Sequence, residues 1–351
     1  MWSGYAMIYT RIIPSQADRI FYEEKLRDFL PEKIFDTHIH TWKLDQIKEP
    51  RFRQRGEDWA ELIEEENPFE RLQEDYSRMF PDTEVTGLLF GWISAKSDVE
   101  AHNRYVGQIV KAHPGWHGLA VTYPHWTAAQ TKAQIEENGL CGMKPYITFV
   151  DSNIETANIT IYDMLTKEQL ELADQSRYIC TIHLPRPGRM ADPENIAQLL
   201  EIDEKYPNAR IIVAHMGRCY SNEDMGDAFE KLRETKNLCF DFSGNTNSNV
   251  IKKGLETFGV KRILFGSDLP LSHIHLKRIY ENGHYVNLIN GNERPQINTA
   301  AYMRPMLDAE QYTFFLYESI GAFRQAAIEQ GLSRAQVQDV MYGNAKRLMQ
   351  R

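Results

Sequence analysis

The segment Lys33-Ile34-Phe35-Asp36-Thr37-His38-Ile39-His40 is a short apolar run that ends in two histidines one residue apart. Side chains alternate faces along a β-strand, so we expect His38 and His40 to point the same way, with Asp36 on that face too. The two imidazoles would lie about 7 Å apart along the strand, within reach of one metal ion. A pair of histidines is also typical of core or surface positions, so the interpretation depends on the rest of the chain.

The rest of the chain alternates short apolar runs with helical segments. Strands are expected at 85–93, 116–123, 140–146, 177–184, 210–216, 238–242 and 262–265, and helices between them at 99–112, 127–138, 167–175, 193–205, 225–235 and 249–258. With the first segment this makes about eight strands, and such alternation predicts a (β/α)8 TIM barrel. The alternative is an open doubly wound sheet, which the absence of a Gly-x-Gly-x-x-Gly turn after an early strand disfavours.

Three further segments flank or interrupt this pattern. Residues 17–30 predict an amphipathic helix leading into the barrel, and residues 41–81 form a long polar insertion after the first strand. We expect the insertion to be solvated and partly helical, and its position allows it to act as a lid. A long loop at 271–308 is followed by helices expected at 311–330 and 334–349. Residues 1–351 are expected to form one domain.

Composition excludes some partners. The chain has 351 residues, 42% of them hydrophobic, and a net charge of −9, which argues against a nucleic-acid surface. No apolar run reaches membrane-spanning length, and the first residues do not resemble a signal peptide. The four cysteines are widely spaced and are expected to be free thiols. We therefore expect a cytoplasmic protein that binds no nucleic acid or membrane; the sequence leaves a homo-oligomer open.

Four more polar residues fall where later strands end. They are Lys144, His183, His215 and Asp268. Active sites of (β/α)8 barrels lie at the C-terminal ends of the strands, so these side chains are expected to meet the two histidines of the first strand. Each alone could be a hydrogen-bonded core residue. A set rich in imidazole with a carboxylate suits Zn²⁺ or a neighbouring first-row ion such as Mn²⁺.

The ordered set resembles the amidohydrolase superfamily of metal-dependent barrels, specifically its amidohydrolase-2 branch. The resemblance rests on Asp36-Thr37-His38-Ile39-His40, His183, His215, Gly266-Ser267-Asp268-Leu269-Pro270 and Tyr342-Gly343-Asn344-Ala345-Lys346-Arg347-Leu348, and it covers nearly the whole chain. It implies that His38, His40 and Asp268 bind the metal, that His183 is a further ligand, and that His215 contacts the substrate or the attacking water.

Lys144 is ambiguous in this comparison. In binuclear members of the superfamily, a lysine on the fourth strand is carbamylated and bridges two metal ions. The motif Gly142-Met143-Lys144-Pro145 is also found in mononuclear members, in which the lysine supports the site or contacts the substrate. This is the interpretation we favour. An uncarbamylated ammonium repels a cation and cannot be a ligand in that form.

The resemblance and the expected ligands favour hydrolysis of an amide, ester or lactone, with Asp268 as proton acceptor and His215 helping to polarise the carbonyl. Decarboxylation of an aromatic or unsaturated acid is the alternative. Hydroxybenzoate-type decarboxylases of the branch have Glu-x-His where this chain has Asp36-x-His38, which disfavours it. Sugar-acid isomerisation and a barrel with a purely structural metal remain weaker hypotheses.

Substrate-binding residues are inferred from position alone. Arg186 and Arg189 follow His183, and Arg218 follows His215, so an anionic small-molecule substrate is expected, because guanidinium groups suit carboxylates. Each arginine could instead brace a loop through an ion pair. Tyr146 is a further candidate; the weaker ones are Trp42, His273 and His275, and we expect a surface role for at least one of the last two.

Overall fold

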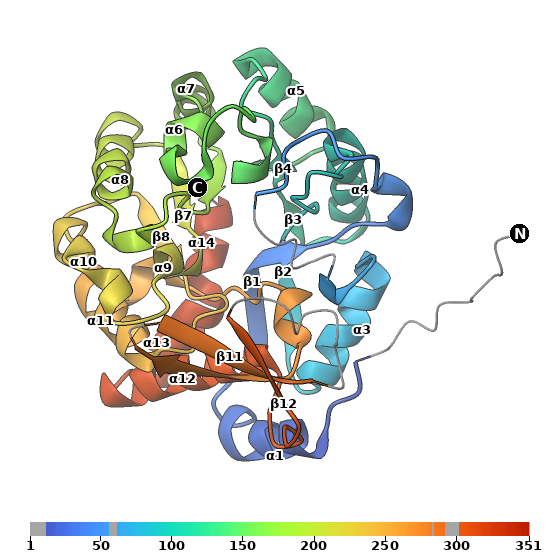
Figure 1. Ribbon diagram of the computed structural model, residues 1–351, viewed down its shortest axis with the longest axis vertical. Helices are drawn as coiled ribbons and strands as arrows, with labels where there is room; N and C mark the ends of the chain where they lie inside the picture. Colours follow the sequence, from blue (N-terminus) through green and yellow to red (C-terminus); the bar gives the residue numbers. More distant parts are fainter. Residues whose placement is uncertain (1–11, 56–61, 283, 292–301, 351) are drawn as a thin grey trace, which may run out of the picture.

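The computed structural model describes residues 12–55, 62–282, 284–291 and 302–350. A ladder of parallel strands forms its centre (Figure 1). The strands are β1 (Lys33–His40), β2 (Glu84–Phe90), β3 (His117–Gly118), β4 (Ala120–Val121), β5 (Gly142–Lys144), β6 (Ile179–Ile182), β7 (Arg210–Val213), β8 (Leu238–Asp241) and β9 (Ile263–Leu264). Leu119 joins β3 to β4, and its backbone N–H donates to Leu89 O, so these two act as one strand of the barrel.

Backbone hydrogen bonds between the first and last strands close the sheet into a barrel. Thr37 N–H donates to Phe265 O at 3.0 Å, and His40 N–H donates to Leu269 O at 2.9 Å. In the other direction, Asp268 N–H donates to His38 O at 2.9 Å. Closure confirms the expected (β/α)8 barrel over the open sheet, and it brings Asp268 beside the histidines of β1.

Helices surround the barrel. They are α3 (Phe69–Met79), α4 (Val99–Ala112), α5 (Ala128–Glu137), α6 (Ile161–Met164), α7 (Lys167–Ser176), α8 (Pro193–Lys205), α9 (His215–Arg218), α10 (Ala228–Lys231), α11 (Ser248–Phe258), α12 (Phe315–Glu329), α13 (Arg334–Gln338) and α14 (Asn344–Gln350). Side-chain caps start several of them where the sequence predicts: Thr127 caps α5, Thr166 caps α7, and Asp192 caps α8 ahead of a proline. The expected helix at 225–235 is reduced to the short α10.

The barrel interior is filled by one cluster of inward-facing apolar residues. Its members include Phe35, Leu88, Leu119, Ile179, Ile212 and Leu264. Ala345 and Leu348 of α14 join this cluster, and Asn344 donates two hydrogen bonds to Val260 O and Ile263 O. The last helix therefore packs against the N-terminal end of the barrel strands and leaves their C-terminal end for the site.

The connection between β1 and β2 is more buried than its polarity suggests. It is partly helical, as expected, since α3 lies within it. The expectation of a solvated segment is wrong for Trp42, Phe69 and Leu72, whose side chains are fully buried or nearly so. Within α3 the buried positions Phe69, Leu72, Tyr76 and Met79 repeat at helical spacing, so this helix packs as a barrel helix rather than as an added insertion.

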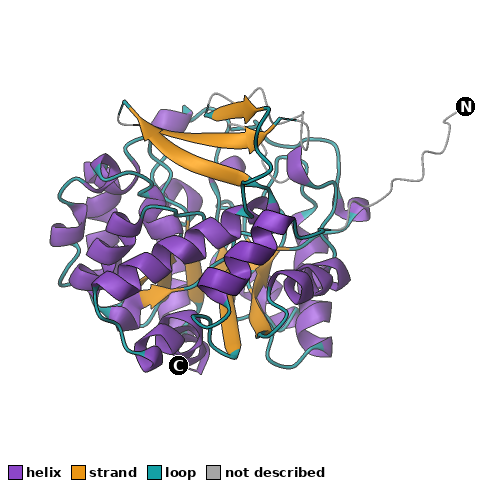
Figure 2. Cartoon of the chain, turned by 90° about the horizontal axis from the view of Figure 1, so that it is seen from below, coloured by secondary structure: helices purple, strands orange, loops and turns teal. Residues whose placement is uncertain are grey.

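A second, small sheet occupies the segment between β9 and α12. Strands β10 (Leu276–Glu281) and β11 (His284–Asn290) pair antiparallel, and β12 (Met303–Met306) pairs parallel with β11. The expected loop at 271–308 is therefore wrong in part, because it contains this sheet. The sheet lies across one end of the barrel, opposite the C-terminus of the chain (Figure 2).

The N-terminal lead-in is helical, as expected, with α1 (Gln16–Phe21) running into a π-helical turn, η1 (Tyr22–Leu26). Asp18 of α1 is buried and contacts His275 Nε2 at 2.7 Å, which ties the lead-in to the segment before β10. None of the described helices is long and apolar enough to cross a membrane.

Candidate metal centre and active site

A cavity of about 270 Å³ opens at the C-terminal ends of the barrel strands. Most of the residues expected there from the sequence line it: His38, His40, Lys144, Tyr146, His183, His215, Arg218 and Asp268. The strand ends converge because the barrel is closed, so side chains more than 200 positions apart in the sequence share one cavity.

Three of these side chains form a group that could hold a metal ion: His38, His40 and Asp268. The Nε2 atoms of His38 and His40 lie 3.6 and 3.5 Å from the same oxygen, Asp268 Oδ1. Ligand atoms about 2.1 Å from one ion at tetrahedral angles lie about 3.4 Å apart. The spacing and the chemistry of this donor set therefore fit a divalent metal ion.

The far nitrogens of both imidazoles are held by acceptors. His38 Nδ1 lies 3.1 Å from Asp241 Oδ2, and His40 Nδ1 lies 3.4 Å from Gly91 O. These contacts favour the tautomer with the proton on Nδ1 and direct the lone pair of Nε2 toward Asp268. Metal-binding histidines typically have such a second hydrogen bond to a carboxylate or a carbonyl.

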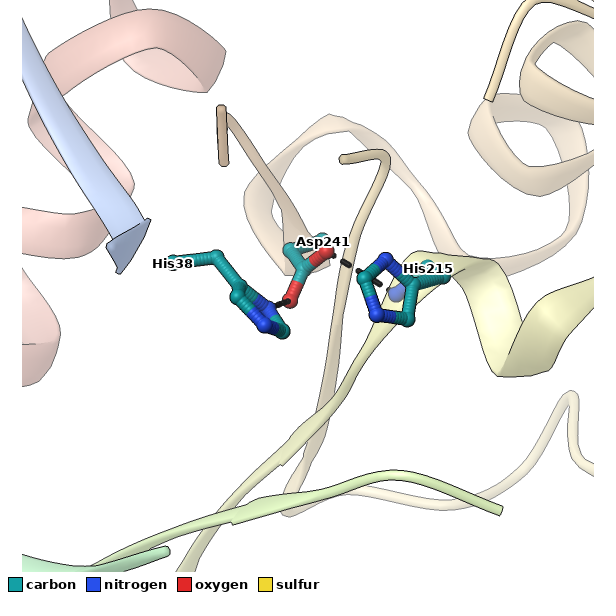
Figure 3. Close-up of side chains that lie close together, drawn as sticks. All are labelled: His38, His215 and Asp241. Carbon is teal, nitrogen blue, oxygen red and sulfur yellow. Dashed lines mark hydrogen bonds and ion pairs between the residues drawn. The ribbon is translucent and has the colours of Figure 1, made fainter. Parts of the chain in front are cut away.

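Asp241, at the end of β8, is a site residue that the sequence reasoning missed. Besides contacting His38, it accepts the backbone N–H of His215 through Oδ1 at 2.9 Å (Figure 3). It also accepts a hydrogen bond from the Ser243 hydroxyl. The available signal was its place as the only carboxylate in the short apolar run Leu238-Cys239-Phe240-Asp241, at the end of a strand like the other site residues.

His215 is held in an unusual backbone conformation. Residues 215–218, labelled α9, follow β7 after Ala214 and all have positive φ, so they form a left-handed turn rather than an ordinary helix; φ is 56° at His215, and Asp268 has a φ of 64°. Such conformations are costly for non-glycine residues and concentrate at functional sites. His215 Nδ1 lies 2.8 Å from Ser243 Oγ and 3.1 Å from Ser243 O, so its ring is fixed while its other nitrogen is left for the cavity.

His183 belongs to the same imidazole cluster, but it is not part of the group of His38, His40 and Asp268. Its ring centroid lies 5.3 Å from that of His215 and 5.1 Å from that of Tyr146. Its Nδ1 is buried and makes no hydrogen bond within the described part of the chain. The expected further ligand therefore lies beside His215 in the same cavity, with one nitrogen that makes no hydrogen bond within the described residues.

Burial sets the protonation of the site. It lowers the pKa of His38, His40 and His183 below the ordinary histidine value, and that of His215 to about 4. Burial alone would raise the pKa of Asp268, but the neighbouring His215, His40 and His38 outweigh it and lower the pKa to about 2. At neutral pH the histidines are neutral and the carboxylate is ionised, which is the form that ligates metals.

Lys144 is completely buried at the end of β5. Its Nζ makes no hydrogen bond within the described residues, and the nearest ring centroids, of Phe90 and Tyr146, lie 5.1 and 5.8 Å away. Burial lowers the pKa of Lys144 to about 8, against the opposing charges of Asp241 and Asp268. A buried amine without a hydrogen-bond partner is costly, and such groups are more frequent at functional sites than elsewhere.

Asp36 does not line the cavity, contrary to the expected shared face. The pairing register of β1 with β2 shifts between Asp36 and Ile39, which breaks the simple alternation of faces. Asp36 Oδ2 instead accepts the hydroxyl of Tyr76 at 2.6 Å, and its Oδ1 accepts the N–H of Ser267 at 2.9 Å. It braces β1 against α3 and the Asp268 turn.

The three arginines expected to bind substrate separate into two groups. Arg218 lines the cavity, and none of the described carboxylates lies within 4.0 Å of it. Arg186 and Arg189 lie outside the cavity lining and pair with Asp192 and Asp224 at 2.9 and 3.0 Å. This placement corrects the expectation for Arg186 and Arg189, since both bind aspartates that brace their own loops.

The weaker candidates lie outside the cavity lining, with Trp42 and His273 buried and His275 partly buried. His273 contacts Glu64 at 3.1 Å, and His275 contacts Asp18, so the expected surface role for one of the two is wrong. Trp42 stacks on Trp92, with ring centroids 5.5 Å apart. Residues that the sequence did not indicate complete the lining, among them Gln54, Arg55, Tyr220, Tyr285 and Tyr302.

Known proteins can now be compared with this geometry. A family model described as amidohydrolase (Amidohydro_2) matches residues 35–351. The chain belongs to the amidohydrolase family. The match confirms the resemblance seen in the sequence, and with it an enzyme family. None of the curated proteins matches the chain.

Solved structures share the fold of this amidohydrolase at low identity. Amidohydrolase 2 from Bifidobacterium longum subsp. infantis has a TM-score of 0.54 and 16% identity, with 91% of this chain and 99% of that chain covered. A probable 2-pyrone-4,6-dicarboxylic acid hydrolase from Acinetobacter baumannii, with citric acid bound, has a TM-score of 0.54 and 13% identity, with 91% of this chain and 99% of that chain covered. A dihydroxybenzoic acid decarboxylase from Polaromonas sp. JS666, with bound manganese, has a TM-score of 0.51 and 15% identity, with 91% of this chain and 96% of that chain covered. Both hydrolases and decarboxylases therefore use this fold.

Proposed function

We propose that this amidohydrolase is a metal-dependent hydrolase that cleaves an amide, ester or lactone bond in a small, carboxylate-bearing substrate. The observation that carries the proposal is the convergence of His38 Nε2 and His40 Nε2 on Asp268 Oδ1, inside a cavity large enough for a small molecule. His183 is the further ligand in this proposal. Zn²⁺ suits the imidazole-rich donor set, and Mn²⁺, present in one structural relative, is the alternative ion.

A bound divalent ion supplies Lewis-acid polarisation and lowers the pKa of water from 15.7 to about 7. In the proposed reaction Asp268 accepts the proton of the attacking water and returns it to the leaving group as the acyl bond breaks. Asp268 is suited to the first step because its low pKa keeps it ionised at neutral pH. His215 is neutral at pH 7 and its ring is held by Ser243. In this proposal it contacts the scissile carbonyl and orients it.

Lys144 acts, in this proposal, as an uncarbamylated residue that supports the site or meets the substrate, beside a single metal ion. Its buried, unsatisfied Nζ supplies a donor for an anionic group, and Tyr146 lies beside it in the lining. Arg218 supplies a second cation. Charge complementarity between these groups and a carboxylate supports an anionic substrate.

The lid predicted at 41–81 narrows in our proposal to residues 41–55, because α3 within the later part of that segment packs as a barrel helix. Gln54 and Arg55 reach the cavity from this segment. The Arg55 guanidinium donates to Asp151 O and Ile154 O, both at 2.7 Å, which holds the segment against the loop after β5. Those contacts position the segment beside the strand ends where the substrate must enter.

The test is a screen of lactones, amides, esters and aromatic acids with purified, metal-loaded enzyme, run in ¹⁸O-labelled water. We expect one class of acyl substrate to be hydrolysed with one ¹⁸O atom incorporated into the product acid and no CO₂ released. Release of CO₂ from an aromatic acid without ¹⁸O incorporation would instead establish the decarboxylase. Full activity after the ion has been removed by a chelator, with the fold intact, would contradict metal dependence.

A further inference from the structure

A second chamber adjoins the site cavity beneath the small sheet. It has a volume of about 110 Å³ and shares Tyr220, Asp268 and Tyr285 with the site cavity. Its remaining lining is mostly apolar and includes residues of β10, β11, β12 and α12. One water occupies about 30 Å³ in the liquid, so this space accommodates a carboxylate on a short carbon stem.

Arg278, on β10, is the charged group of this chamber. Its Nε donates to Asn287 Oδ1 at 2.8 Å, and its Nη1 donates to Gly244 O at 2.7 Å. Its guanidinium carbon lies 4.5 Å from the Tyr285 ring centroid, 4.8 Å from that of Tyr220 and 4.7 Å from that of Phe315. Two hydrogen bonds and three rings therefore fix the side chain before any ligand arrives.

The Arg278 guanidinium has no anionic partner among the residues that the structure describes. Within the described part of the chain, no carboxylate lies within 4.0 Å of Arg278, and its Nη2 makes no hydrogen bond. Arg189 offers a comparison, because its guanidinium also lies over Tyr220 and Tyr285 but pairs with Asp224. A partly buried cation without a counter-ion is unfavourable unless a ligand provides one.

Arg278 and Arg218 line adjoining chambers on either side of the shared residues Tyr220 and Asp268. We propose that Arg278 forms a second carboxylate subsite, so that the substrate carries an acid group at each end of its scissile part. One carboxylate is bound at Arg218, and the other enters the smaller chamber and accepts a hydrogen bond from Arg278 Nη2. This inference rests on the proposed function for the identity of the reacting centre, but the subsite itself is a property of the small sheet.

Calorimetric titration tests the subsite without turnover. The probes are the linear dicarboxylates from succinate to pimelate, each compared with its half-amide. We expect at least one dicarboxylate to bind about tenfold or more tightly than its half-amide, because a guanidinium–carboxylate pair is lost in the half-amide. Arg278→Gln should abolish this preference, and Arg278→Lys, which keeps the charge but loses the fixed fork, should restore part of it.

The matched control is Arg304→Gln on β12, which removes the same charge from the same sheet. Arg304 is exposed and pairs with Glu281. It should keep the wild-type preference. Equal binding of dicarboxylates and half-amides by the wild type, or an unchanged preference in folded Arg278→Gln, would overturn the subsite. An Arg278-dependent preference in a protein that hydrolyses nothing would overturn the proposed hydrolase and leave the subsite standing.

Discussion

His38 and Asp241 lie on strands that are not neighbours in the barrel, β1 and β8, yet His38 Nδ1 is 3.1 Å from Asp241 Oδ2. The same carboxylate accepts the backbone N–H of His215 and the N–H of Ser243. One buried acid therefore orients a proposed metal ligand and a proposed substrate-contacting residue together. Burial acts to raise the pKa of Asp241, but the electrostatic interaction with His38, together with their hydrogen bond, keeps that pKa well below its ordinary value.

Replacing this carboxylate tests its role. Asp241→Asn keeps the shape of the side chain, but its amide group cannot accept equally from His38 and from the backbone of His215. We expect metal affinity to fall by about 10–100-fold, the range typical for outer hydrogen-bond partners of metal ligands. Competition with a fluorescent chelator measures the metal affinity. Asp227→Asn is the control, since Asp227 is exposed and, within the described part of the chain, forms an ion pair with Lys231. Equal metal affinities in both variants would contradict the role of Asp241.

Asp268→Asn separates metal binding from proton transfer. The amide oxygen can still face His38 and His40, but it cannot accept and return a proton. We expect kcat to fall by about 10²–10⁴-fold, the usual contribution of a positioned acid–base group. The measurement is steady-state hydrolysis at saturating metal, with metal content determined on the same sample. Activity near the wild-type level would remove Asp268 as the base.

Two arginines that look equivalent in the sequence should behave differently. Arg218→Gln should raise KM for an anionic substrate by about tenfold or more, because Arg218 faces the cavity without a carboxylate partner. Arg186→Gln should leave KM unchanged, because Arg186 pairs with Asp192 outside the cavity lining. A higher KM in Arg186→Gln alone would show that the cavity does not contain the substrate carboxylate.

Asp75, on α3, predicts a pH dependence of stability away from the site. Burial raises its pKa to about 7, against the opposing charge of Arg71. The folded state then binds a proton that the unfolded state releases near pH 4, so this contribution is complete below about pH 4 and is lost as pH rises to about 7. Asp75→Asn should flatten the fall in unfolding free energy between pH 4.5 and 7.5, by at most about 4 kcal/mol. Parallel pH profiles of the two proteins in denaturant titrations would contradict the raised pKa.

The sequence predicted the barrel and most of the proposed metal ligands because both depend on local patterns. Each strand is a short apolar run; His38 and His40 lie in the last part of β1, His183 directly follows β6, and Asp268 comes four residues after β9. Once closure places all strand ends together, no further geometry is needed to bring these side chains into one cavity. Asp241 also lies at a strand end, but it falls inside the segment expected as a strand at 238–242 and outside the motifs that carry the family resemblance, so it was missed.

Features that depend on contacts between distant loops could not be predicted. In the small sheet β11 pairs with both β10 and β12, and the polar sequence of this segment has no clear alternation. Arg278 and Tyr285 could therefore not be recognised as lining residues. Arg186, Arg189 and Arg218 all follow strand ends, and only the positions of Asp192 and Asp224 decide which of them are already paired. The alternation of faces also failed at Asp36, because the register shift in β1 is set by its neighbour strand.

Metal content per chain tests the central claim most directly. Elemental analysis of the purified wild type should give close to one divalent ion per chain, and His40→Ala, which removes one of the two Nε2 atoms facing Asp268, should lose most of it while circular dichroism shows an intact fold. Close to two ions in the wild type would contradict the single-metal role given to Lys144. A folded His40→Ala variant that retains the full wild-type content would contradict the metal centre itself.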